Sequence, residues 1–194
     1  VFPGYRDAPQ LTAQAFDAEG YYCIGDAGLL ADQSRPERGV LFNGRVAEDF
    51  KLGSGTWVSV GTLRVRVVSA LAPHAQDVVV TGHDRDDVGM LVFPDEEETR
   101  RLAPHLPADT PFAEVCCDQT VKDVFQERLA AIARTATGSS TRVVRIALLA
   151  APPSIDLGEA TDKGSLNQRA VLANRAADVE ALYADVAAPH VVRL

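Results

Sequence analysis

Apolar residues between positions 50 and 94 recur at spacings that predict a hairpin, a helix and two strands. Two β-prone runs flank Gly53-Ser54-Gly55 within Phe50–Val60, a spacing that fits a glycine-turned hairpin and equally a flexible loop. Apolar residues four positions apart between Thr62 and Leu71 indicate a short amphipathic helix. The valine-rich runs Asp77–Gly82 and Val88–Pro94 are expected to be strands joined by an acidic turn.

The second half of the chain continues this pattern of helices and strands. A polar connector occupies 95–111, and its acidic run Asp95–Glu98 is expected to be a solvated turn. Apolar residues at helical spacing from 121 to 132 predict a helix, Arg142–Ala150 predicts a third strand, and Leu166–Val186 predicts a final helix. The order of these elements predicts an α+β fold, in which a hairpin and a three-stranded sheet have helices packed on them.

The first 43 residues have a different character. A loop and a helical turn are expected over 1–20, and the short β-prone runs Tyr21–Ile24 and Gly39–Asn43 suggest a second hairpin. A polar stretch, Gly44–Asp49, separates this region from the α+β unit. We therefore expect a domain boundary here, with one part at 1–46 and the other at 47–194.

Composition and charge narrow the class of protein. The chain has 194 residues, of which 46% are hydrophobic and 24% charged, as in a globular protein rather than a disordered one. A net charge of −8 argues against binding to nucleic acid or to an anionic membrane surface. No apolar run approaches the ~20 residues that span a bilayer. We expect a cytoplasmic protein with no membrane span and no nucleic-acid partner.

Cysteine and histidine provide no obvious chemistry. Cys23, Cys116 and Cys117 have no metal-ligand spacing and suit reduced thiols. Cys116 and Cys117 precede a predicted helix, where a lowered thiol pKa and plain core packing are both open, with packing favoured. The four histidines are scattered. No metal site is expected.

The first candidate stretch is 20–26, which ends in Gly25-Asp26. A carboxylate after a glycine at a strand end can accept hydrogen bonds from both hydroxyls of a ribose. Gly-Asp is also a common turn, and the residues alone favour that interpretation.

The second candidate stretch is 44–58, which contains Gly44-Arg45, Lys51 and the glycines around Ser54. A glycine-rich turn can bring backbone N–H groups close to phosphate, but a plain hairpin needs the same glycines. The residues alone do not decide between the two.

The third candidate stretch is 158–169, where Lys163 lies on a glycine-bearing loop just before a helix. Such a lysine can reach a neighbouring site as a mobile charge. The simpler interpretation is a solvated loop in which Ser165 or Asn167 caps the last helix. Only Lys51, Lys122 and Lys163 are lysines, so few other residues could supply an ammonium group.

The three stretches together resemble the AMP-forming adenylating enzymes, the superfamily of acyl-CoA synthetases, luciferases and peptide-synthetase adenylation domains. The resemblance spans essentially the whole chain and its last stretch looks most like feruloyl-CoA synthetases. The residues that carry it are Gly4-Tyr5-Arg6-Asp7, Thr12, Phe16, Gly20-Tyr21-Tyr22, Gly25-Asp26, Gly44-Arg45, Phe50–Val58 and Thr161–Arg169.

The resemblance implies the C-terminal part of a carboxylic acid:CoA ligase. The phosphate loop and acid pocket of the family would lie in a large N-terminal domain that precedes these residues. Residues 1–46 would be the end of that domain, and 47–194 a small mobile lid. The chain begins Val1-Phe2-Pro3-Gly4, and we expect it to be part of a longer protein and inactive alone.

The resemblance also implies roles for individual residues. Asp26 would accept the ribose hydroxyls of the nucleotide, with Arg45 in support, and Ala47 would be the hinge. Lys51, Gly53, Ser54 and Gly55 would face CoA, and Lys163 would be catalytic. ATP with Mg²⁺, CoA and an aryl or hydroxycinnamic acid would be substrates, and no tightly bound cofactor is expected.

Three positions depart from the family pattern. In the register T-x-x-G-K the lysine position holds Ser165, so Lys163, on the other side of Gly164, is assigned the role. Ala47 replaces the usual Asp or Lys, and Ile24 the threonine of T-G-D. A competing hypothesis is therefore a non-catalytic interaction or carrier-docking module that retains the small-domain fold.

Overall fold

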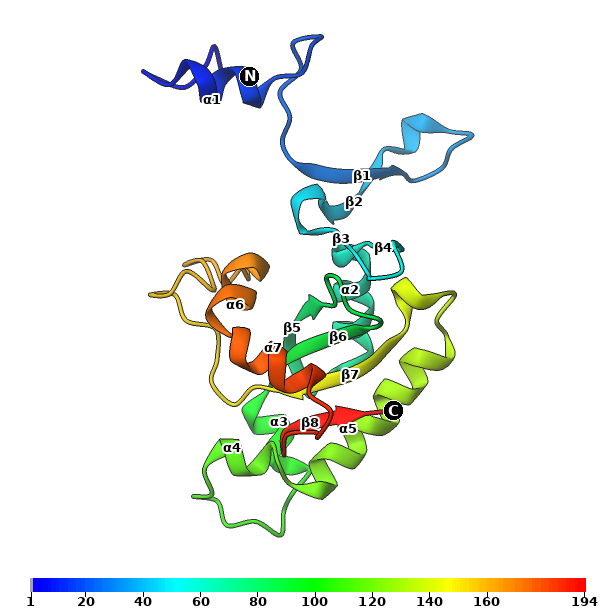
Figure 1. Cartoon of the computed structure of the whole chain (residues 1–194), viewed down its shortest axis with the longest axis vertical. Coiled ribbons are helices and arrows are strands. Elements are labelled where there is room, and N and C mark those ends of the chain that lie inside the picture. The colour runs from blue at the N-terminus through cyan, green and yellow to red at the C-terminus, as the bar shows by residue number, and fades with distance from the viewer. Residues whose placement is uncertain (1) are drawn as a thin grey trace. The chain divides into compact units, whose positions relative to one another are not determined.

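The computed structural model describes residues 2–194 and divides the chain into two compact units, Val1–Ala47 and Glu48–Leu194 (Figure 1). Each unit has its own elements and is described by itself.

The first unit contains a helix, a short 3₁₀ turn and a two-stranded sheet. Helix α1 (Pro9–Ala15) follows the N-terminal loop, as predicted. Strand β1 (Asp26–Leu30) pairs antiparallel with β2 (Val40–Arg45), and η1 (Pro36–Arg38) lies in their connection. A further 3₁₀ turn, η2 (Val46–Glu48), contains the boundary between the two units along the chain.

The predicted strand at Tyr21–Ile24 is wrong. The Asp17 carboxylate accepts hydrogen bonds from the N–H groups of Glu19 and Tyr21, which forms a turn at this point. Tyr22 then makes a single bridge with Phe16, and the rings of these two residues pack edge to face. The hairpin of this unit is therefore built from β1, which starts only at Asp26.

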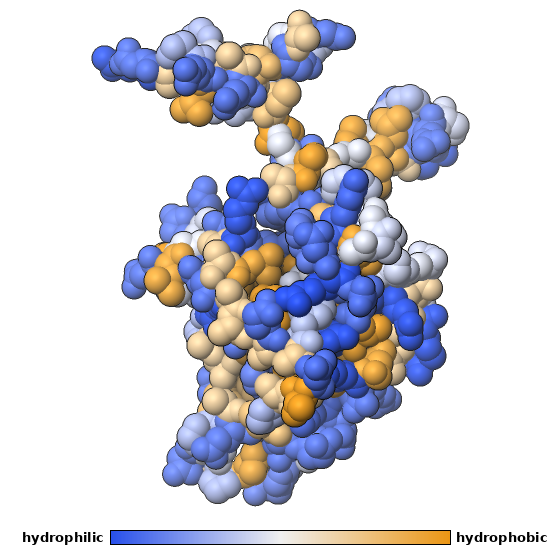
Figure 2. All heavy atoms as spheres, in the orientation of Figure 1, coloured by the Kyte–Doolittle hydropathy of each residue, from blue (hydrophilic) through white to orange (hydrophobic). Residues whose placement is uncertain are grey.

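Large apolar side chains are exposed along the β1–β2 hairpin, where Figure 2 shows orange side chains. They come from both strands: Leu29, Leu30, Val40, Leu41 and Phe42. The N-terminal unit thus has little core of its own.

The second unit has an α+β fold around a four-stranded mixed sheet. Its strands are β5 (Ala75–Thr81), β6 (Val88–Pro94), β7 (Val143–Leu148) and β8 (Val191–Arg193), in that spatial order. Strands β6 and β7 run parallel and the other pairs are antiparallel. The first three strands were predicted; β8 is an addition, because three residues are too few for a periodic pattern.

Helices cover both faces of this sheet (Figure 1). Along β5, Val78 and Val80 point to one face and Val79 to the other, and all three are fully buried. Helices α2 (Val60–Leu71) and α5 (Gln119–Arg134) pack on the first face, and both were predicted. Helices α6 (Gln168–Asn174) and α7 (Ala176–Tyr183) pack on the second.

The predicted final helix over Leu166–Val186 is interrupted. Arg175 adopts a non-helical backbone (φ −108°, ψ 33°) and separates α6 from α7. Its side chain donates hydrogen bonds to the Ala151 carbonyl and the Glu159 carboxylate, both in the segment before α6. The periodicity of the sequence runs through this break and does not reveal it.

The acidic run after β6 is not a solvated turn but the start of helix α3 (Glu96–Arg101). Asp95 caps the helix by accepting the Glu98 N–H at 3.0 Å, and the glutamates of the first turn lie where the helix dipole favours negative charge. A short helix, α4 (Phe112–Val115), follows the proline-rich connector.

Strand β5 is an edge strand whose outer N–H groups are bound by side chains. The Val78 N–H donates to the Asp77 carboxylate at 2.7 Å, and the Val80 N–H donates to the Gln168 amide oxygen at 3.1 Å. Gln168 is buried, and it links α6 directly to the sheet.

Candidate functional site

The glycine-rich stretch forms the predicted hairpin, in which β3 (Phe50–Lys51) pairs with β4 (Trp57–Val58). The Leu52 N–H donates to the Thr56 carbonyl at 3.0 Å, and the Gly55 N–H donates to the Leu52 carbonyl at 2.8 Å. Gly55 has a φ of +82°, which favours glycine. Gly53, Ser54 and Gly55 form the exposed tip.

The turn between β5 and β6 fixes the backbone of this hairpin. The Gly53 N–H donates to the Arg85 carbonyl at 2.8 Å, and the Asp84 N–H donates to the Lys51 carbonyl at 3.1 Å. A Cβ on Gly53 would lie 3.4 Å from the Asp84 carbonyl oxygen, which is van der Waals contact, so the hairpin and the turn pack closely here. The hairpin is therefore part of the second unit and not a flexible loop.

Lys51 and Trp57 make an exposed cation–π pair on this hairpin. The Lys51 Nζ lies 5.0 Å from the ring centroid of Trp57, whose surface is 61% exposed. The pair presents a positive charge beside an aromatic face, which suits a ligand with phosphate and a planar ring.

Lys163 lies at the tip of a second, smaller hairpin. Ala160 and Leu166 form its only bridge, the Thr161 N–H donates to the Ser165 carbonyl at 2.9 Å, and the Gly164 N–H donates to the Thr161 carbonyl at 2.9 Å. Gly164 has a φ of +77° and closes the turn as Gly55 does in the first hairpin.

The side chain of Lys163 is exposed, and within residues 2–194 it has no hydrogen bond or ion pair. The hairpin itself leads into a buried base, because Leu166 and Gln168 are both buried. Asn167 caps α6 by accepting the Ala170 N–H at 3.3 Å, as the simpler interpretation predicted. An exposed tip and a helix cap thus coexist in this stretch.

A buried ion pair lies at the base of this hairpin, and no pattern in the sequence indicates it. Glu159 is 1% exposed and accepts two hydrogen bonds from the Arg175 guanidinium. These hydrogen bonds hold the pKa of the Glu159 carboxyl below its usual value. The two residues lie in different predicted elements, and no spacing in the sequence connects them.

Asp26 and Arg45 come together in the first unit, where they are cross-strand partners on β1 and β2. Both are exposed, and the Val46 N–H donates to the Gly25 carbonyl at 3.0 Å, which closes this end of the hairpin. Ala47 follows in η2 as the last residue of the first unit. The other predicted residues, Lys51 to Gly55 and Lys163, belong to the second unit.

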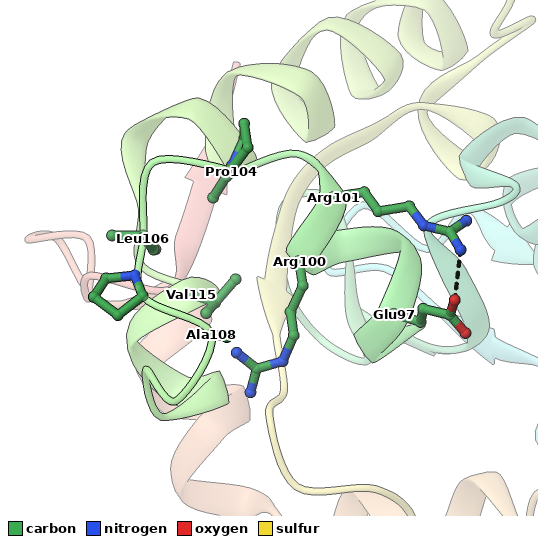
Figure 3. A pocket seen from close by; sticks show the side chains of 9 residues that line it. Glu97, Arg100, Arg101, Pro104, Leu106, Ala108 and Val115 are labelled. Atoms are coloured by element: carbon green, nitrogen blue, oxygen red, sulfur yellow. Dashed lines mark hydrogen bonds and ion pairs between the residues drawn. The ribbon is translucent and has the colours of Figure 1, made fainter.

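Two surface pockets of the second unit differ in their relation to these residues. One lies beside the Lys163 hairpin and is lined by Asp162 and Gly164 of its tip, together with Gln76, Asp77, Phe93, Pro153, Ile155, Ala160, Thr161 and Leu166. The other lies between α3, the connector and α4 (Figure 3).

The pocket in Figure 3 contains none of the predicted site residues. Its charged groups are paired already: Arg101 with Glu97 and Glu98, and Arg100 with Glu96 and the Thr110 carbonyl. This pocket therefore adds nothing to the predicted residues, which stay candidates in two separate places: the two hairpins of the second unit and the Asp26 end of the β1–β2 hairpin in the first unit.

Cys116 contributes no reactive group to the candidate site. Cys116 is buried, and desolvation raises the pKa of its thiol to about 12, which confirms core packing over an activated thiolate. Across residues 2–194 no three His, Cys, Asp or Glu side chains gather as a metal site. No helix in this range is long and apolar enough to cross a membrane.

Comparison with known proteins gives a consistent match. The protein-family model described as AMP-binding enzyme C-terminal domain matches residues 55–187. The chain is 24% identical over 190 residues to "Long-chain-fatty-acid--[acyl-carrier-protein] ligase AEE15, chloroplastic" of Arabidopsis thaliana, which covers 94% of the chain and 24% of the relative. It is 27% identical over 188 residues to a carboxylic acid reductase of Segniliparus rugosus, which covers 96% of the chain and 14% of the relative.

Solved structures show the same fold. The A domain of the Segniliparus rugosus carboxylic acid reductase, in complex with AMP and a co-purified carboxylic acid, has a TM-score of 0.73 at 23% identity, covering 94% of this chain and 26% of that one. ATP-bound MatB from Rhodopseudomonas palustris has a TM-score of 0.56 at 20% identity, covering 92% and 29%. The chain thus spans between 14% and 29% of the length of these proteins.

Proposed function

Because the chain belongs to the family of AMP-binding enzyme C-terminal domains, we propose that it is the C-terminal part of an ATP-dependent, AMP-forming carboxylic acid:CoA ligase. The observation that carries the proposal is the exposed ammonium group of Lys163, which has no ion-pair partner among residues 2–194 and lies at the tip of a hairpin with a buried base. Such a group can enter a site and neutralise charge there without first breaking an ion pair.

The reaction has two steps that share one site. A carboxylate oxygen of the acid attacks the α-phosphorus of Mg·ATP, the bond to the β-phosphate breaks, and pyrophosphate leaves. The thiolate of CoA then attacks the acyl carbon of the adenylate, the bond to the phosphate oxygen breaks, and AMP leaves. Lys163 bridges the carboxylate and the α-phosphate in the first step, which positions them and stabilises the negative charge that builds up.

The other predicted residues hold the two nucleotides. The Asp26 carboxylate accepts the ribose hydroxyls of ATP and Arg45 supports the same nucleotide. Lys51, Gly53, Ser54 and Gly55 face CoA in the second step. Residues 1–46 complete the preceding large domain, and 47–194 turn as a lid about Ala47 between the steps, which also excludes water.

The acid and the location complete the proposal. An aryl or hydroxycinnamic acid such as a feruloyl-type acid is proposed as the substrate, because the last stretch resembles that branch. Cys23, Cys116 and Cys117 are free thiols, which supports a reducing, cytoplasmic location.

The test compares two lysine variants in the full-length protein. Lys163→Ala should abolish acid-dependent pyrophosphate exchange, measured with a panel of aryl and fatty acids, and leave the thioesterification of a preformed acyl-adenylate largely intact. Lys122→Ala, which removes an ammonium group from α5, is the matched control and should leave both steps unchanged. Equal loss in both steps, or no loss with Lys163→Ala, would contradict the role of Lys163.

One observation favours a second candidate function. Ser165 stands in the register where the family has its lysine, which suits a non-catalytic interaction or carrier-docking module. Pyrophosphate exchange by the full-length protein separates the two candidates, because a docking module has none with any acid. The relatives also include a ligase named for an acyl-carrier protein, so the second step is measured with both CoA and a phosphopantetheinylated carrier.

A further inference from the structure

The segment between β7 and α6, which includes the Lys163 hairpin, is long and irregular, yet it contains a buried carboxylate. Residues 149–167 run between β7 and α6 without a strand or helix of their own. Glu159 lies in this segment and is the one buried carboxylate in the part of the chain that the structure describes. It lies four positions before Lys163 along the chain.

Three hydrogen bonds satisfy the Glu159 carboxylate. The Arg175 Nε donates to Oε1 at 3.0 Å and the Arg175 Nη2 donates to Oε2 at 2.8 Å, in a two-pronged arrangement. The Ser154 N–H donates to Oε2 at 2.8 Å, so the carboxylate also holds the beginning of the loop.

Arg175 extends this network to the end of β7 and to the sheet. Its Nη1 donates to the Ala151 carbonyl at 3.1 Å and its Nη2 donates to the Pro152 carbonyl at 2.8 Å. The guanidinium lies 5.3 Å from the ring centroid of Phe93 on β6. One side chain at the break between α6 and α7 thus binds the loop, its first carbonyls and the sheet.

The backbone of Glu159 closes the base of the Lys163 hairpin. Its N–H donates to the Ser154 carbonyl at 2.9 Å, and its carbonyl accepts the Asn167 N–H at 2.7 Å. The bridge between Ala160 and Leu166 comes immediately after this bond. One arm of the hairpin therefore starts at Glu159, which the ion pair holds, and the other arm ends at Asn167, which is bonded to Glu159. The backbone hydrogen bonds of the tip are those of its own turn.

A buried ion pair is a poor means of adding stability, because well-packed apolar residues of similar volume often stabilise as much or more. It does fix geometry, since the guanidinium and carboxylate accept few arrangements. The pair is thus better suited to holding the loop in one conformation than to stabilising the core.

We propose that Glu159 and Arg175 are positioning residues that fix the base of the Lys163 hairpin and so determine where the Lys163 ammonium group can reach. For catalysis this rests on the function proposed above. The fixing of the hairpin itself does not, and it can be measured separately.

A lysine-specific protease can measure how often the Lys163 hairpin opens, because Lys51, Lys122 and Lys163 are the only residues of this chain after which it can cut. Glu159→Gln keeps the shape of the side chain and removes its charge. Cleavage after Lys163, followed by mass spectrometry in the full-length protein, should then rise about tenfold or more, since local opening governs the rate. Cleavage after Lys51 and Lys122 should stay constant.

The matched control is Glu180→Gln, which breaks the exposed ion pair of Glu180 with Arg85. It should leave all three cleavage rates unchanged. An unchanged rate after Lys163 in Glu159→Gln would overturn the proposal. If Glu159→Gln raises all three cleavage rates together, the deciding variant is Arg175→Lys, which keeps the positive charge but cannot make the two-pronged hydrogen bonds. A selective rise in cleavage after Lys163 in Arg175→Lys would support the proposal. Any other result with Arg175→Lys would overturn it.

The catalytic consequence is measured as a split between kinetic parameters. Glu159→Gln should lower the kcat of pyrophosphate exchange about tenfold or more and leave both the KM for ATP and the thioesterification of a preformed adenylate nearly unchanged. A rise in KM alone, or equal loss in both steps, would contradict a positioning role. If Lys163→Ala has no effect on exchange, the proposed function fails while the protease result stands on its own.

Discussion

Asp26 and Arg45 lie directly opposite each other on β1 and β2. Opposite residues of an antiparallel pair project to the same face of the sheet, so an exposed carboxylate and an exposed guanidinium leave the hairpin on one side. The two residues that the family resemblance assigns to one nucleotide are therefore neighbours in space, although a loop of the hairpin separates them along the chain.

This relationship predicts the effect of Asp26→Asn on nucleotide binding. Losing a charged acceptor for the ribose hydroxyls should weaken AMP binding by the full-length protein by about 1.5–3 kcal/mol, or roughly 10- to 150-fold in Kd. Isothermal titration calorimetry provides the measurement. Glu37→Gln, an exposed carboxylate in η1 of the same hairpin, is the control and should have no effect. Equal affinities for the Asp26 and Glu37 variants would remove Asp26 from the nucleotide site.

Trp57 offers a second test, because it is the single tryptophan of the chain and is largely exposed beside Lys51. If this hairpin faces CoA, adding CoA to the 194-residue chain should quench tryptophan emission, and Lys51→Ala should weaken the quenching several-fold. Adenosine without phosphate is the control ligand. Emission that does not respond to CoA, in the chain or in the full-length protein, would contradict the assignment of this hairpin.

Gly55 provides a test of backbone conformation. A Cβ at Gly55 meets no atom within 4 Å, yet φ is +82°, so Gly55→Ala should lower the free energy of unfolding by about 1 kcal/mol. Gly138 also has open space around it, but its φ of 177° is extended, so Gly138→Ala should be neutral. Urea unfolding measures both variants. Equal effects would show that the hairpin tip relaxes freely.

The buried thiol of Cys116 predicts a dependence of stability on alkaline pH. Its pKa is raised from 9.0 to about 12, so the folded state holds this proton more tightly than the unfolded state does. The contribution of this buried thiol to the free energy of unfolding is fully present below pH 9 and is lost as the pH rises from 9.0 towards 12. Urea unfolding should show that the free energy of unfolding decreases less between pH 8 and pH 10 in Cys116→Ala than in the wild type. In the native protein at pH 8, a thiol reagent should label the exposed Cys23 and spare Cys116.

Whereas Cys116 predicts a loss of stability at alkaline pH, the Glu159 carboxyl predicts that the protein loses stability at acidic pH. Its pKa is lowered from 4.5, first by the hydrogen bonds from Arg175, so its contribution to stability is present above that value and is lost as the pH falls through the folded-state pKa. The free energy of unfolding should therefore decrease more steeply below pH 4.5 in the wild type than in Glu159→Gln. Parallel curves would mean that the carboxyl is not linked to folding.

Strands and helices of the second unit were predictable where burial left a plain pattern. Val78, Val79 and Val80 are buried on alternate faces of a covered sheet, so the run is wholly apolar. α2 and α5 each bury one face and therefore show helical spacing. α3 escaped prediction because its residues are almost all charged and its signal is the cap at Asp95, not an apolar stripe.

The candidate site was less predictable than the fold. Residues within one turn, such as Gly53 to Gly55 or Thr161 to Ser165, could be located from local sequence because backbone bonds between near neighbours build each tip. Glu159 and Arg175 are 16 residues apart and their contact depends on how α6 packs on the sheet, so no local pattern records it. The β-propensity of Tyr21–Ile24 likewise concealed the turn at Asp17, so the sequence placed a strand there and not at β1.

The side-chain bonds along the edge of β5 have a consequence for self-association. An edge strand with unsatisfied N–H groups is a template on which another copy can add a strand and start a polymer. At Val78 and Val80 these donors are already bound by Asp77 and Gln168, and Asp77 also carries charge at the same edge. The second unit thereby protects this sheet edge from strand-by-strand aggregation through its own side chains.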